Sequence, residues 1–363
     1  MAPRRPTIRD VATLAGVSIA TVSNVFSGSK PVNAELRERV ERAARELSYQ
    51  VDRAASQLRS GQAKVVGMLV PDLDDAFFTS LVSRLEVMAG KDGYDVIVAS
   101  SRDDVEVEKS RLAALLGWRP SGLVAVPCSD TVPQLLADEA HRLPMVLADR
   151  VEREGSFVDT VAIDNFEAGE IAARHLVALG HRDVVIAASH LSFAPIRERV
   201  RGAETFMLSS IGVPPVVVEL GSNGERGAEI FQQWLARHSR PTAVLALTNV
   251  TTLGVLSALA ATRIDVPEQV SIIGFDDYAW MSARKTALTA IRQPLDEMAR
   301  VVWDRLRARM SGDQSPPHQI ELNISLQVRD SVRSLAGLEN QPAAVVPSPS
   351  QDDLPEAGQK AVH

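Results

Sequence analysis

Cysteine is almost absent from this sequence. Cys128 is the only one in 363 residues, which excludes an intrachain disulfide framework and a zinc site built on cysteines. We expect its side chain to be a small buried apolar group. The N-terminal segment MAPRRPTIRD is charged with no apolar run behind it, and no stretch reaches the roughly 18 unbroken apolar residues of a membrane helix. These absences predict a soluble protein of the reducing cytoplasm.

Motifs of nucleotide-dependent and hydrolytic enzymes are also missing. The first predicted strand is followed by PDLDDAFF, which has no Gly-x-Gly-x-x-Gly to bring backbone amides onto a pyrophosphate, and no Walker-type Gly-Lys-Ser/Thr loop occurs. GVSIA lacks the second glycine of a nucleophile elbow. There is no His-Glu-x-x-His, and we interpret His175 and His181 as a helix-surface and a turn residue rather than metal ligands. We therefore predict that the protein is not an enzyme and has neither cofactor nor metal.

Over the whole chain, basic and acidic residues are nearly balanced, but the two parts of the chain differ in the sign of their net charge. The whole chain carries a formal charge of −7, from 39 basic and 46 acidic residues. Residues 1–64 hold 11 lysines and arginines against 6 acidic residues, a net charge of +5, so the remainder carries −12. A basic N-terminal module on an acidic body is the asymmetry typical of a DNA-binding head.

The segment TIRDVATLAGVSIATVSNVFSG predicts two short helices separated by a tight turn. Gly16 can adopt the positive φ that ends the first helix, and Ser18 can cap the second. Thr7 with Asp10 three residues later is close to a capping box. The apolar residues recur at helical spacing: Ile8, Val11, Ala12, Ala15, Val17, Val22 and Val25.

A third helix is predicted from Ala34 to about Leu47, with Asn33 as its cap. Its outer face should be a solvated stripe of ion pairs, because Glu precedes Arg by four residues at Glu35/Arg39, Glu38/Arg42 and Glu41/Arg45. The following segment, SYQVDRAASQLRSGQAK, is too short, and its side chains are too small, to form a stable isolated helix.

From Lys64 onward the pattern changes to α/β. Near-continuous apolar runs alternate with amphipathic segments such as residues 80–93, 167–180 and 249–262, which predicts βαβ units and doubly wound parallel sheets covered on both faces. The length exceeds one such sheet, so we expect two lobes with a cleft between them. The predicted strands lie in residues 65–71, 95–100, 122–127, 145–149, 160–164, 183–189, 216–220, 243–247 and 270–275.

The second N-terminal helix has the residue types that read DNA. In a helix-turn-helix this helix enters the major groove with its first residues at base edges. Asn24 can bond bidentately to adenine, while Ile19 and Ala20 suit a thymine methyl. The expected phosphate contacts, which orient without specifying sequence, are Thr7, Arg9 and Ser23. A three-helix module that binds protein is the alternative.

The chain resembles the LacI/GalR family of bacterial transcription regulators from about Thr7 to Val332. The first block, TIRDVATLAGVSIATVSNVFSG, is highly specific to that family. The later blocks are shared more loosely with periplasmic sugar-binding proteins. They are VNAELRERVERAARELSY, AIDNFEAGEIAARHLVALGHRD, RPTAVLAL, VPEQVSIIGFDD, LTAIRQP and SLQVRDS.

The resemblance implies a helix-turn-helix head, a hinge helix and an effector-binding core, acting as a homodimer on a palindromic operator. Ile19, Ala20 and Asn24 match the family's base-reading positions, and Leu58 matches the hinge leucine that wedges into the minor groove. Ala55, one turn earlier, would let two hinge helices approach closely. The further DNA contacts implied in this head and hinge are Ser18, Thr21 and Arg59.

The hinge departs from the family pattern at one point. Val51 and Asp52 stand where the family usually has Pro-Asn. Asp52 remains a good N-cap, but without proline the backbone before the hinge is less constrained. We expect a hinge that becomes ordered only on DNA, and hinge helicity measured without DNA would contradict this.

Five candidate effector residues follow the carboxyl ends of strands, where open α/β sheets bind ligands, and the resemblance adds Phe193 and Arg199. By resemblance they would stack aromatic rings on a sugar or base and form charge-assisted hydrogen bonds. Gly202 completes the family's Arg-x-x-Gly motif. The residues are Phe77, Phe78, Asp149, Phe193, Arg199, Asn249 and Asp276.

The chemistry of the ligand stays open between a sugar, a sugar phosphate and a nucleoside-like molecule. Asn249 stands where many relatives have Asp, and Phe193 stands where some have a polar contact. The phenylalanine pair has core packing as an alternative role, and Asp276 has a turn-capping role. Nothing in the sequence separates an inducer from a corepressor.

The expected organisation is a head at 1–50, a hinge at 51–63, a core at 64–334 and a disordered tail at 335–363. The first lobe is expected at about 64–162 and 293–325, and the second at about 163–292. No heptad helix for tetramer formation follows Leu326, which favours a dimer. Ligand-driven opening or closing of the lobes would shift the population able to bind DNA. The alternatives are a sugar-binding module that reads no DNA and an enzyme that acts on the ligand.

Overall fold

The computed structural model describes residues 6–27, 30–49, 64–129, 132–151 and 156–335. The expected hinge, with Ala55, Leu58 and Arg59, lies outside the described residues, as does the expected disordered tail from residue 336 onward. Within the described part, no helix combines the length and apolar character needed to cross a membrane.

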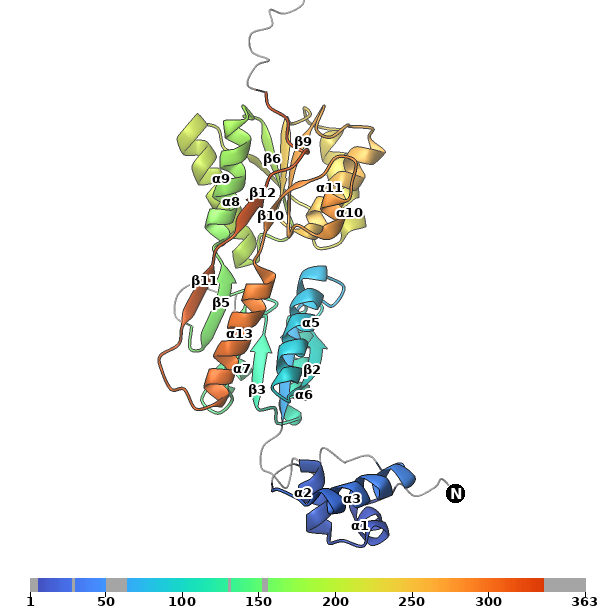
Figure 1. The fold of residues 1–363 in the computed structure, drawn as a ribbon. Coiled ribbons are helices and arrows are strands. Elements are labelled where there is room, and N and C mark those ends of the chain that lie inside the picture. The colour runs from blue at the N-terminus through green and yellow to red at the C-terminus, as the bar shows by residue number, and fades with distance from the viewer. Residues whose placement is uncertain (1–5, 28–29, 50–63, 130–131, 152–155, 336–363) are drawn as a thin grey trace, which may run out of the picture. The chain divides into compact units, whose positions relative to one another are not determined.

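Three helices form the N-terminal head: α1 (Ile8–Ala15), α2 (Ile19–Ser27) and α3 (Ala34–Glu46) (Figure 1). The predicted helix signals are confirmed. Gly16 has φ +63° and ends α1, and the Ser18 hydroxyl accepts the Thr21 N–H at 3.1 Å. The Thr7 N–H donates to Asp10 Oδ2 at 2.7 Å. Asn33 caps α3 by accepting the Glu35 N–H at 2.9 Å.

The head has a small aliphatic core, because alanines and valines let three short helices approach closely. The buried members are Val11, Ala12, Ala15, Val22, Val25, Val40, Ala43 and Ala44. Of the predicted ion pairs on α3, the structure has Glu38–Arg42 at 3.0 Å and Glu41–Arg45 at 4.0 Å.

The expected Glu35–Arg39 pair is wrong. Arg39 instead donates from Nη2 to the Ala15 carbonyl at 2.7 Å and to the Gly16 carbonyl at 3.3 Å. These carbonyls lie at the end of α1, where the backbone has no helical donor of its own. Arg39 therefore joins α3 to the turn between α1 and α2.

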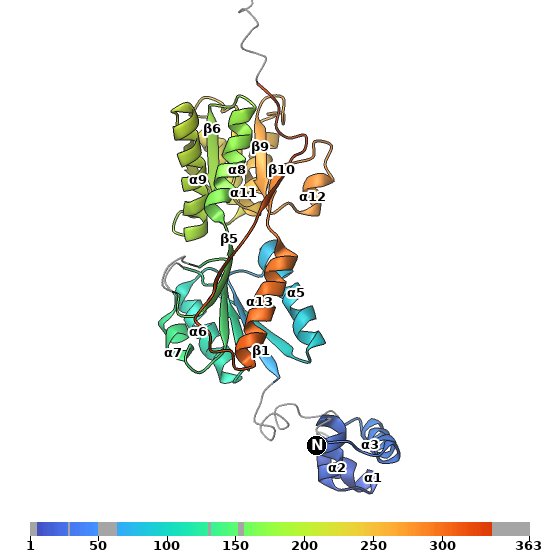
Figure 2. The ribbon, with the colours of Figure 1, turned by 60° about the vertical axis from the view of Figure 1, so that its left-hand side comes forward.

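The first lobe is built on a six-stranded sheet in the order β11-β5-β4-β3-β1-β2, and every neighbouring pair is parallel. Helices α5 and α13 pack against each other, while α6 packs with α7 and against β1 and β2 (Figure 2). The strands are β1 (Val65–Val70), β2 (Asp95–Ser100), β3 (Gly122–Ala125), β4 (Met145–Ala148), β5 (Asp159–Ile163) and β11 (Gln319–Leu322). The helices are α5 (Ala76–Lys91), α6 (Val105–Gly117), α7 (Gln134–Glu139) and α13 (Leu295–Met310).

The second lobe has a six-stranded sheet in the order β12-β10-β9-β8-β6-β7, in which only the β10–β12 pair is antiparallel. Helices α8 and α9 pack together, as do α10 and α11 (Figure 1). The strands are β6 (Val184–Ala188), β7 (Val216–Glu219), β8 (Ala243–Ala246), β9 (Ser271–Phe275), β10 (Thr289–Arg292) and β12 (Ser325–Gln327). The helices are α8 (Asn165–Ala178), α9 (Ala194–Ile211), α10 (Gly224–Leu235), α11 (Asn249–Ala261) and α12 (Ala279–Ser282).

The two predicted sheets and the nine predicted strands are therefore confirmed. Most of the central strands are buried, which explains their near-continuous apolar runs. The chain divides into one unit of residues 1–163 and 294–322 and a second of 164–293 and 323–363. Ser325, which the sequence-based division gives to the first lobe, pairs with Arg292 in the second sheet.

His181 differs in environment from its sequence-based description. It follows the left-handed Gly180, as a turn residue should, but its side chain is buried. Its Nδ1 lies 3.0 Å from Thr242 Oγ1 and its Nε2 lies 3.0 Å from the Arg333 carbonyl. Both ring nitrogens are thus used in holding the second lobe together. Across the described residues, no group of three acidic, histidine or cysteine side chains is arranged to hold a metal ion.

Candidate functional site

The surface of helix α2 that points away from the core of the head carries both polar and apolar side chains. Ile19 is 43% exposed although it is a large apolar residue. Ala20 is exposed and Asn24 is half-buried, whereas Val22 and Val25 point into the core. Because positions four apart lie on one face of a helix, Ala20 and Asn24 are neighbours there. Ala20 and Asn24 thus share one face of α2, and Ile19 is exposed at the first residue of the same helix.

Three of the hydroxyl groups expected to contact DNA, those of Thr7, Ser18 and Thr21, lie at helix N-termini. The Ser18 and Thr21 hydroxyls are 2.9 Å apart at the start of α2. Thr7 begins α1, with its hydroxyl donating to Asp10 at 2.8 Å. Helix N-termini attract phosphate because their first N–H groups point outward and carry partial positive charge. Ser23 is half-buried on α2.

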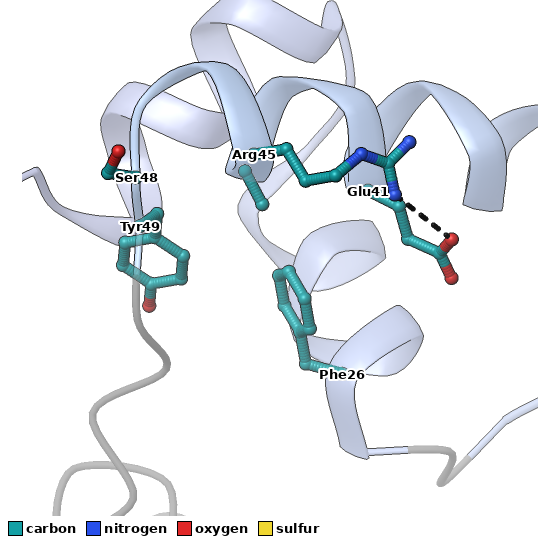
Figure 3. Close-up of a pocket in the computed structure, with 6 residues that line it drawn as sticks. Phe26, Glu41, Arg45, Ser48 and Tyr49 are labelled. Carbon is teal, nitrogen blue, oxygen red and sulfur yellow. Dashed lines mark ion pairs between the residues drawn. The ribbon is translucent and has the colours of Figure 1, made fainter.

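The head also has an open hollow of about 410 Å³ near the end of α3. Figure 3 shows the rings of Phe26 and Tyr49 beside the Glu41–Arg45 pair. The two rings pack at 6.0 Å, and the Tyr49 N–H closes α3 on the Ala44 carbonyl at 2.8 Å. The hollow is lined by Phe26, Glu41, Ala44, Arg45, Ser48 and Tyr49, so it contains none of the predicted DNA-reading residues.

In the second lobe, Arg199 is buried and fixed by three different contacts. Its Nε donates to Asn165 Oδ1 at 2.8 Å and its Nη1 donates to the Leu247 carbonyl at 2.6 Å. The guanidinium lies 3.8 Å from the centre of the Phe275 ring. Burying a charged group requires such pairing. The Arg199 side chain therefore extends from α9 to the carboxyl edge of the sheet, where β8 and β9 end.

Asp276 and Asn249 meet at the same edge of the second sheet. Asp276 follows β9 with φ +77°, in the left-handed region. Its Oδ2 accepts the Asn249 N–H at 3.1 Å, and its Oδ1 accepts Gln293 Nε2 at 2.6 Å. The amide oxygens of Asn249 and Gln293 are buried without a hydrogen-bond partner among the described residues. Such acceptors are costly when unpaired, so they suit a ligand with hydrogen-bond donors.

A close crossing of α8 and α9 places Asn165 and Arg199 within reach of each other. A Cβ atom on Gly202 would lie 2.0 Å from the Phe166 carbonyl oxygen. A Cβ on Gly169 would likewise collide with the Arg199 carbonyl. Only glycine fits this crossing, which explains the Arg-x-x-Gly motif in physical terms.

Phe193 stands immediately before α9. Its ring packs edge-on against His190, with centroids 5.6 Å apart. Phe193 is half-buried, so part of its ring surface is accessible. Phe193 therefore packs with His190 at the start of α9.

In the first lobe, Phe77 and Phe78 begin α5, which Asp75 caps by accepting the Phe77 N–H at 2.8 Å. The two rings pack edge to face at 5.2 Å. Phe77 is 6% exposed and Phe78 is 3% exposed, so both contribute to the core of this lobe. A ligand would reach little of either ring in this conformation.

Asp149 and Arg150 follow β4 at the same edge of the first sheet. Asp149 is buried and has φ +60°. The Arg150 guanidinium forms an ion pair with Asp103 and lies 5.3 Å from the centre of the Phe78 ring. Arg150 is thus linked to one of the predicted aromatic residues.

Sequence reasoning missed four polar residues at the two edges. Asn165 and Arg150 each directly follow a residue that ends a predicted strand, which is a signal that could have found them. Gln293 follows β10, whose short run of apolar residues hides the strand. Asp103 could be found only from the tertiary structure, because its relevance comes from its partner Arg150.

Comparison with known proteins agrees with this arrangement. Residues 7–52 match the model of bacterial regulatory proteins of the lacI family. Residues 173–332 match the model of periplasmic binding protein-like domains. The HTH-type transcriptional repressor PurR of Escherichia coli O139:H28 is 32% identical over 330 residues, which cover 90% of this chain and 96% of that repressor. PurR of Pectobacterium atrosepticum is 29% identical over 336 residues, with the same shares covered.

Solved structures show the same likeness. A lac repressor dimer bound to operator and the anti-inducer ONPF superposes with a TM-score of 0.80 and 28% identity, covering 91% of this chain and all of that one. A complex of the transcriptional regulator CelR with cellobiose gives a TM-score of 0.66 and 28% identity, covering 90% of this chain and all of that one. The head and the two-sheet core together define a DNA-binding transcriptional regulator with a small-molecule-binding core. The chain belongs to the lacI family of bacterial regulatory proteins.

Proposed function

We propose that this chain is a repressor that acts as a homodimer on a palindromic operator in the bacterial cytoplasm. Its response is set by a small molecule bound at the polar residues of the carboxyl edge of the second sheet. The repressor role is supported by the PurR relatives, and the dimer by the lac repressor dimer on its operator.

The strongest support for DNA reading is the exposed face of α2. Ile19 remains 43% exposed in a head whose other apolar residues are mostly buried. An exposed aliphatic side chain such as Ile19 is suited to thymine methyls, and the Asn24 amide is suited to adenine edges. Thr7, Ser18, Thr21 and Ser23 supply hydroxyls for phosphate contacts around it.

The effector site rests on the cluster of Arg199, Asn249 and Asp276. Its buried acceptors without partners suit a ligand with several hydroxyl or N–H donors. A ligand that binds one conformation of the core better than another shifts the population able to bind DNA. We propose no catalytic activity toward that ligand. Turnover of a bound ligand by the purified protein would contradict this.

Selection of binding sites from a randomised duplex library, with the purified full chain at a fixed salt concentration, tests the DNA-reading role. We expect a palindrome with a central CG step, where Leu58 would insert. Asn24→Ala should relax the selection at one base pair per half-site, by about 1–3 kcal/mol of discrimination. Leu58→Ala should weaken binding to the selected duplex.

Leu14→Ala is the matched control. Leu14 is 47% exposed on α1, so the change removes an accessible apolar side chain from the head without touching α2 or altering charge. It should leave the selected sequence unchanged. If Asn24→Ala and Leu58→Ala bind the duplex like the unchanged chain, the assigned contacts are wrong. Recovery of no preferred sequence with or without added metabolites would favour a binding module that does not read DNA.

A further inference from the structure

Helix α3 ends in a turn that places a residue other than glycine in the left-handed region. Ser48 has φ +50°. The Ser48 N–H donates to the Arg45 carbonyl at 3.0 Å, and the Tyr49 N–H donates to the Ala44 carbonyl at 2.8 Å. These two bonds form a Schellman motif, in which the left-handed residue is usually glycine. A residue with a Cβ atom is disfavoured in this conformation, so the contacts around the turn maintain it.

The turn brings the Tyr49 side chain onto α2. The Tyr49 and Phe26 rings pack with centroids 6.0 Å apart and planes tilted by 49°, and Figure 3 shows both rings on the same side of α3. Phe26 is the next to last residue of α2 (Ile19–Ser27). Both side chains are half-buried and pack on the aliphatic core of the head. Tyr49 thus joins the end of α3 to the end of the helix expected to read bases.

The surroundings of Tyr49 leave this contact exposed on one side. The open hollow of about 410 Å³ is lined by both rings, so the core encloses them only in part. The Glu41–Arg45 pair at the same hollow is 4.0 Å long, with side chains that are 43% and 70% exposed. Such an exposed pair contributes little to stability. The position of the Tyr49 ring therefore depends strongly on the Phe26 ring and on the turn at Ser48.

The direction in which the chain leaves the head is set at this turn. Residues 50–63, which follow Tyr49 and connect it to β1, lie outside the described part of the chain. In a dimer with helix-turn-helix heads, each reading helix enters a major groove, and the separation of the two half-sites follows the separation of these helices. A contact that fixes α2 relative to the exit of the chain therefore restricts the separation that a dimer accepts.

We propose that the turn at Ser48 and the Tyr49–Phe26 contact determine the half-site spacing of the operator. Tyr49 is a positioning residue, because it acts through Phe26 and through the path of the chain without touching a base. The inference rests on the proposed function, in which a homodimer reads a palindrome. It adds that the face of α2 determines the base preference, while the contact at the other end of α2 determines the spacing.

The test uses the duplex selected by the unchanged full chain and two derivatives, one with a base pair inserted at the centre and one with a base pair removed. Anisotropy titration at one fixed salt concentration gives the three affinities. The unchanged chain should bind each derivative at least about tenfold more weakly, on the scale of one mismatched base pair. Tyr49→Ala should reduce this loss to less than about fivefold, because its two heads can adopt either spacing.

The ratio of affinities separates positioning from stability. A variant that only destabilises the head binds all three duplexes more weakly in the same proportion, so its ratios stay those of the unchanged chain. Tyr49→Phe keeps the ring contact and should also keep the ratios. Thermal melting of the head in the same variants measures the structural effect independently.

Ser48→Gly and Ser48→Val form a matched pair. Both changes remove the same exposed hydroxyl. Glycine adopts the left-handed conformation readily, so Ser48→Gly should keep the spacing ratios and raise the melting temperature of the head. Valine is β-branched and opposes this conformation. Ser48→Val should therefore tolerate the altered spacings as Tyr49→Ala does.

Three results would overturn the inference. The first is an unchanged chain that binds the altered duplexes as tightly as the selected one. The second is a folded Tyr49→Ala variant with the ratios of the unchanged chain. The third is equal ratios for Ser48→Gly and Ser48→Val, which decides the question if Tyr49→Ala does not fold. Failure of the proposed function has a different signature, because the unchanged chain would then select no palindrome.

Discussion

Gly169 and Arg199 meet backbone to backbone where α8 crosses α9. A Cβ atom on Gly169 would lie 1.9 Å from the Arg199 carbonyl oxygen, a distance that no real contact reaches. The crossing therefore sets the position of the α9 turn that carries the Arg199 guanidinium. A packing requirement in the backbone thus determines where a predicted effector residue lies.

Gly169→Ala should force α8 and α9 apart. We expect a loss of at least about 2 kcal/mol in the free energy of unfolding of the second lobe, because the clash is with backbone that cannot move aside alone. The Arg199–Asn165 hydrogen bond should lengthen, and effector affinity should fall with it. Urea unfolding followed by circular dichroism measures the first effect. Gly90→Ala is the control, since a Cβ there would meet nothing within 4 Å. It should be neutral or stabilise by up to about 1 kcal/mol.

Asp276→Asn and Asp277→Asn form a second matched comparison. Both residues have positive φ, which asparagine tolerates, and both changes remove one negative charge. Asp276 receives the Asn249 and Gln293 donors, so its replacement should abolish the effector's influence on operator affinity while the urea midpoint changes little. Asp277 has a buried carboxylate paired with Arg292 and Arg329. Its replacement should lower the midpoint. The reverse pattern would show that Asp276 is structural.

Arg39→Met should destabilise the head by about 1–3 kcal/mol, because the Ala15 carbonyl loses its charged donor. Arg42→Met removes the same charge from the same helix but breaks only the exposed pair with Glu38. Operator affinity should therefore depend on salt concentration in the same way for the two variants. Thermal melting of the head should separate them. Equal melting temperatures would contradict the capping role of Arg39.

Asp159 makes the first lobe sensitive to acid. Burial alone would raise its pKa, but hydrogen bonds from Arg309 and the His318 N–H, with the charges of Arg305 and Arg309, outweigh burial and lower the pKa below its ordinary value. A carboxyl group whose pKa is lower in the folded than in the unfolded protein stabilises the fold at pH values above its unfolded pKa of about 4. That contribution is lost as the pH falls through the lower folded value.

Asp159→Asn should cost about 3–5 kcal/mol at neutral pH, because it removes the fully buried carboxylate that pairs with the half-buried Arg305 and Arg309 guanidinium groups. Its urea midpoint should also change less than that of the unchanged chain when the pH is lowered toward 3. Asp296→Asn serves for comparison, since it breaks an exposed pair with Arg84 worth less than about 1 kcal/mol. A similar loss in both variants would refute the buried network as the source of acid sensitivity.

Cys128 should be inert in the folded protein. Burial, followed by the charge of nearby Glu108, raises the pKa of its thiol to about 12. The thiolate is the reactive form, so a chromogenic disulfide reagent at pH 8 should label the chain only as fast as the first lobe opens. Because the sequence has one cysteine, the signal reports this site alone. Rapid stoichiometric labelling without denaturant would contradict the expectation.

The sequence by itself determined the elements and their class. Ser18, Gly16 and Asn33 act on backbone groups within a few residues, so the head's helix boundaries follow from local chemistry. The buried parallel strands show as apolar runs because both of their faces are covered. The short strand β10 and the two later strands lack such runs, and their places depend on pairing with distant partners.

Only the tertiary structure decided which side chains act together. Arg39 leaves its expected helical partner because the packing of three helices brings the Ala15 carbonyl at the end of α1 within 2.7 Å of its guanidinium. Gln293 reaches Asp276, and Asp103 reaches Arg150, across 17 and 47 residues of sequence. Spacing along the chain cannot encode such contacts, because they depend on how sheets and helices bring distant loops to one edge.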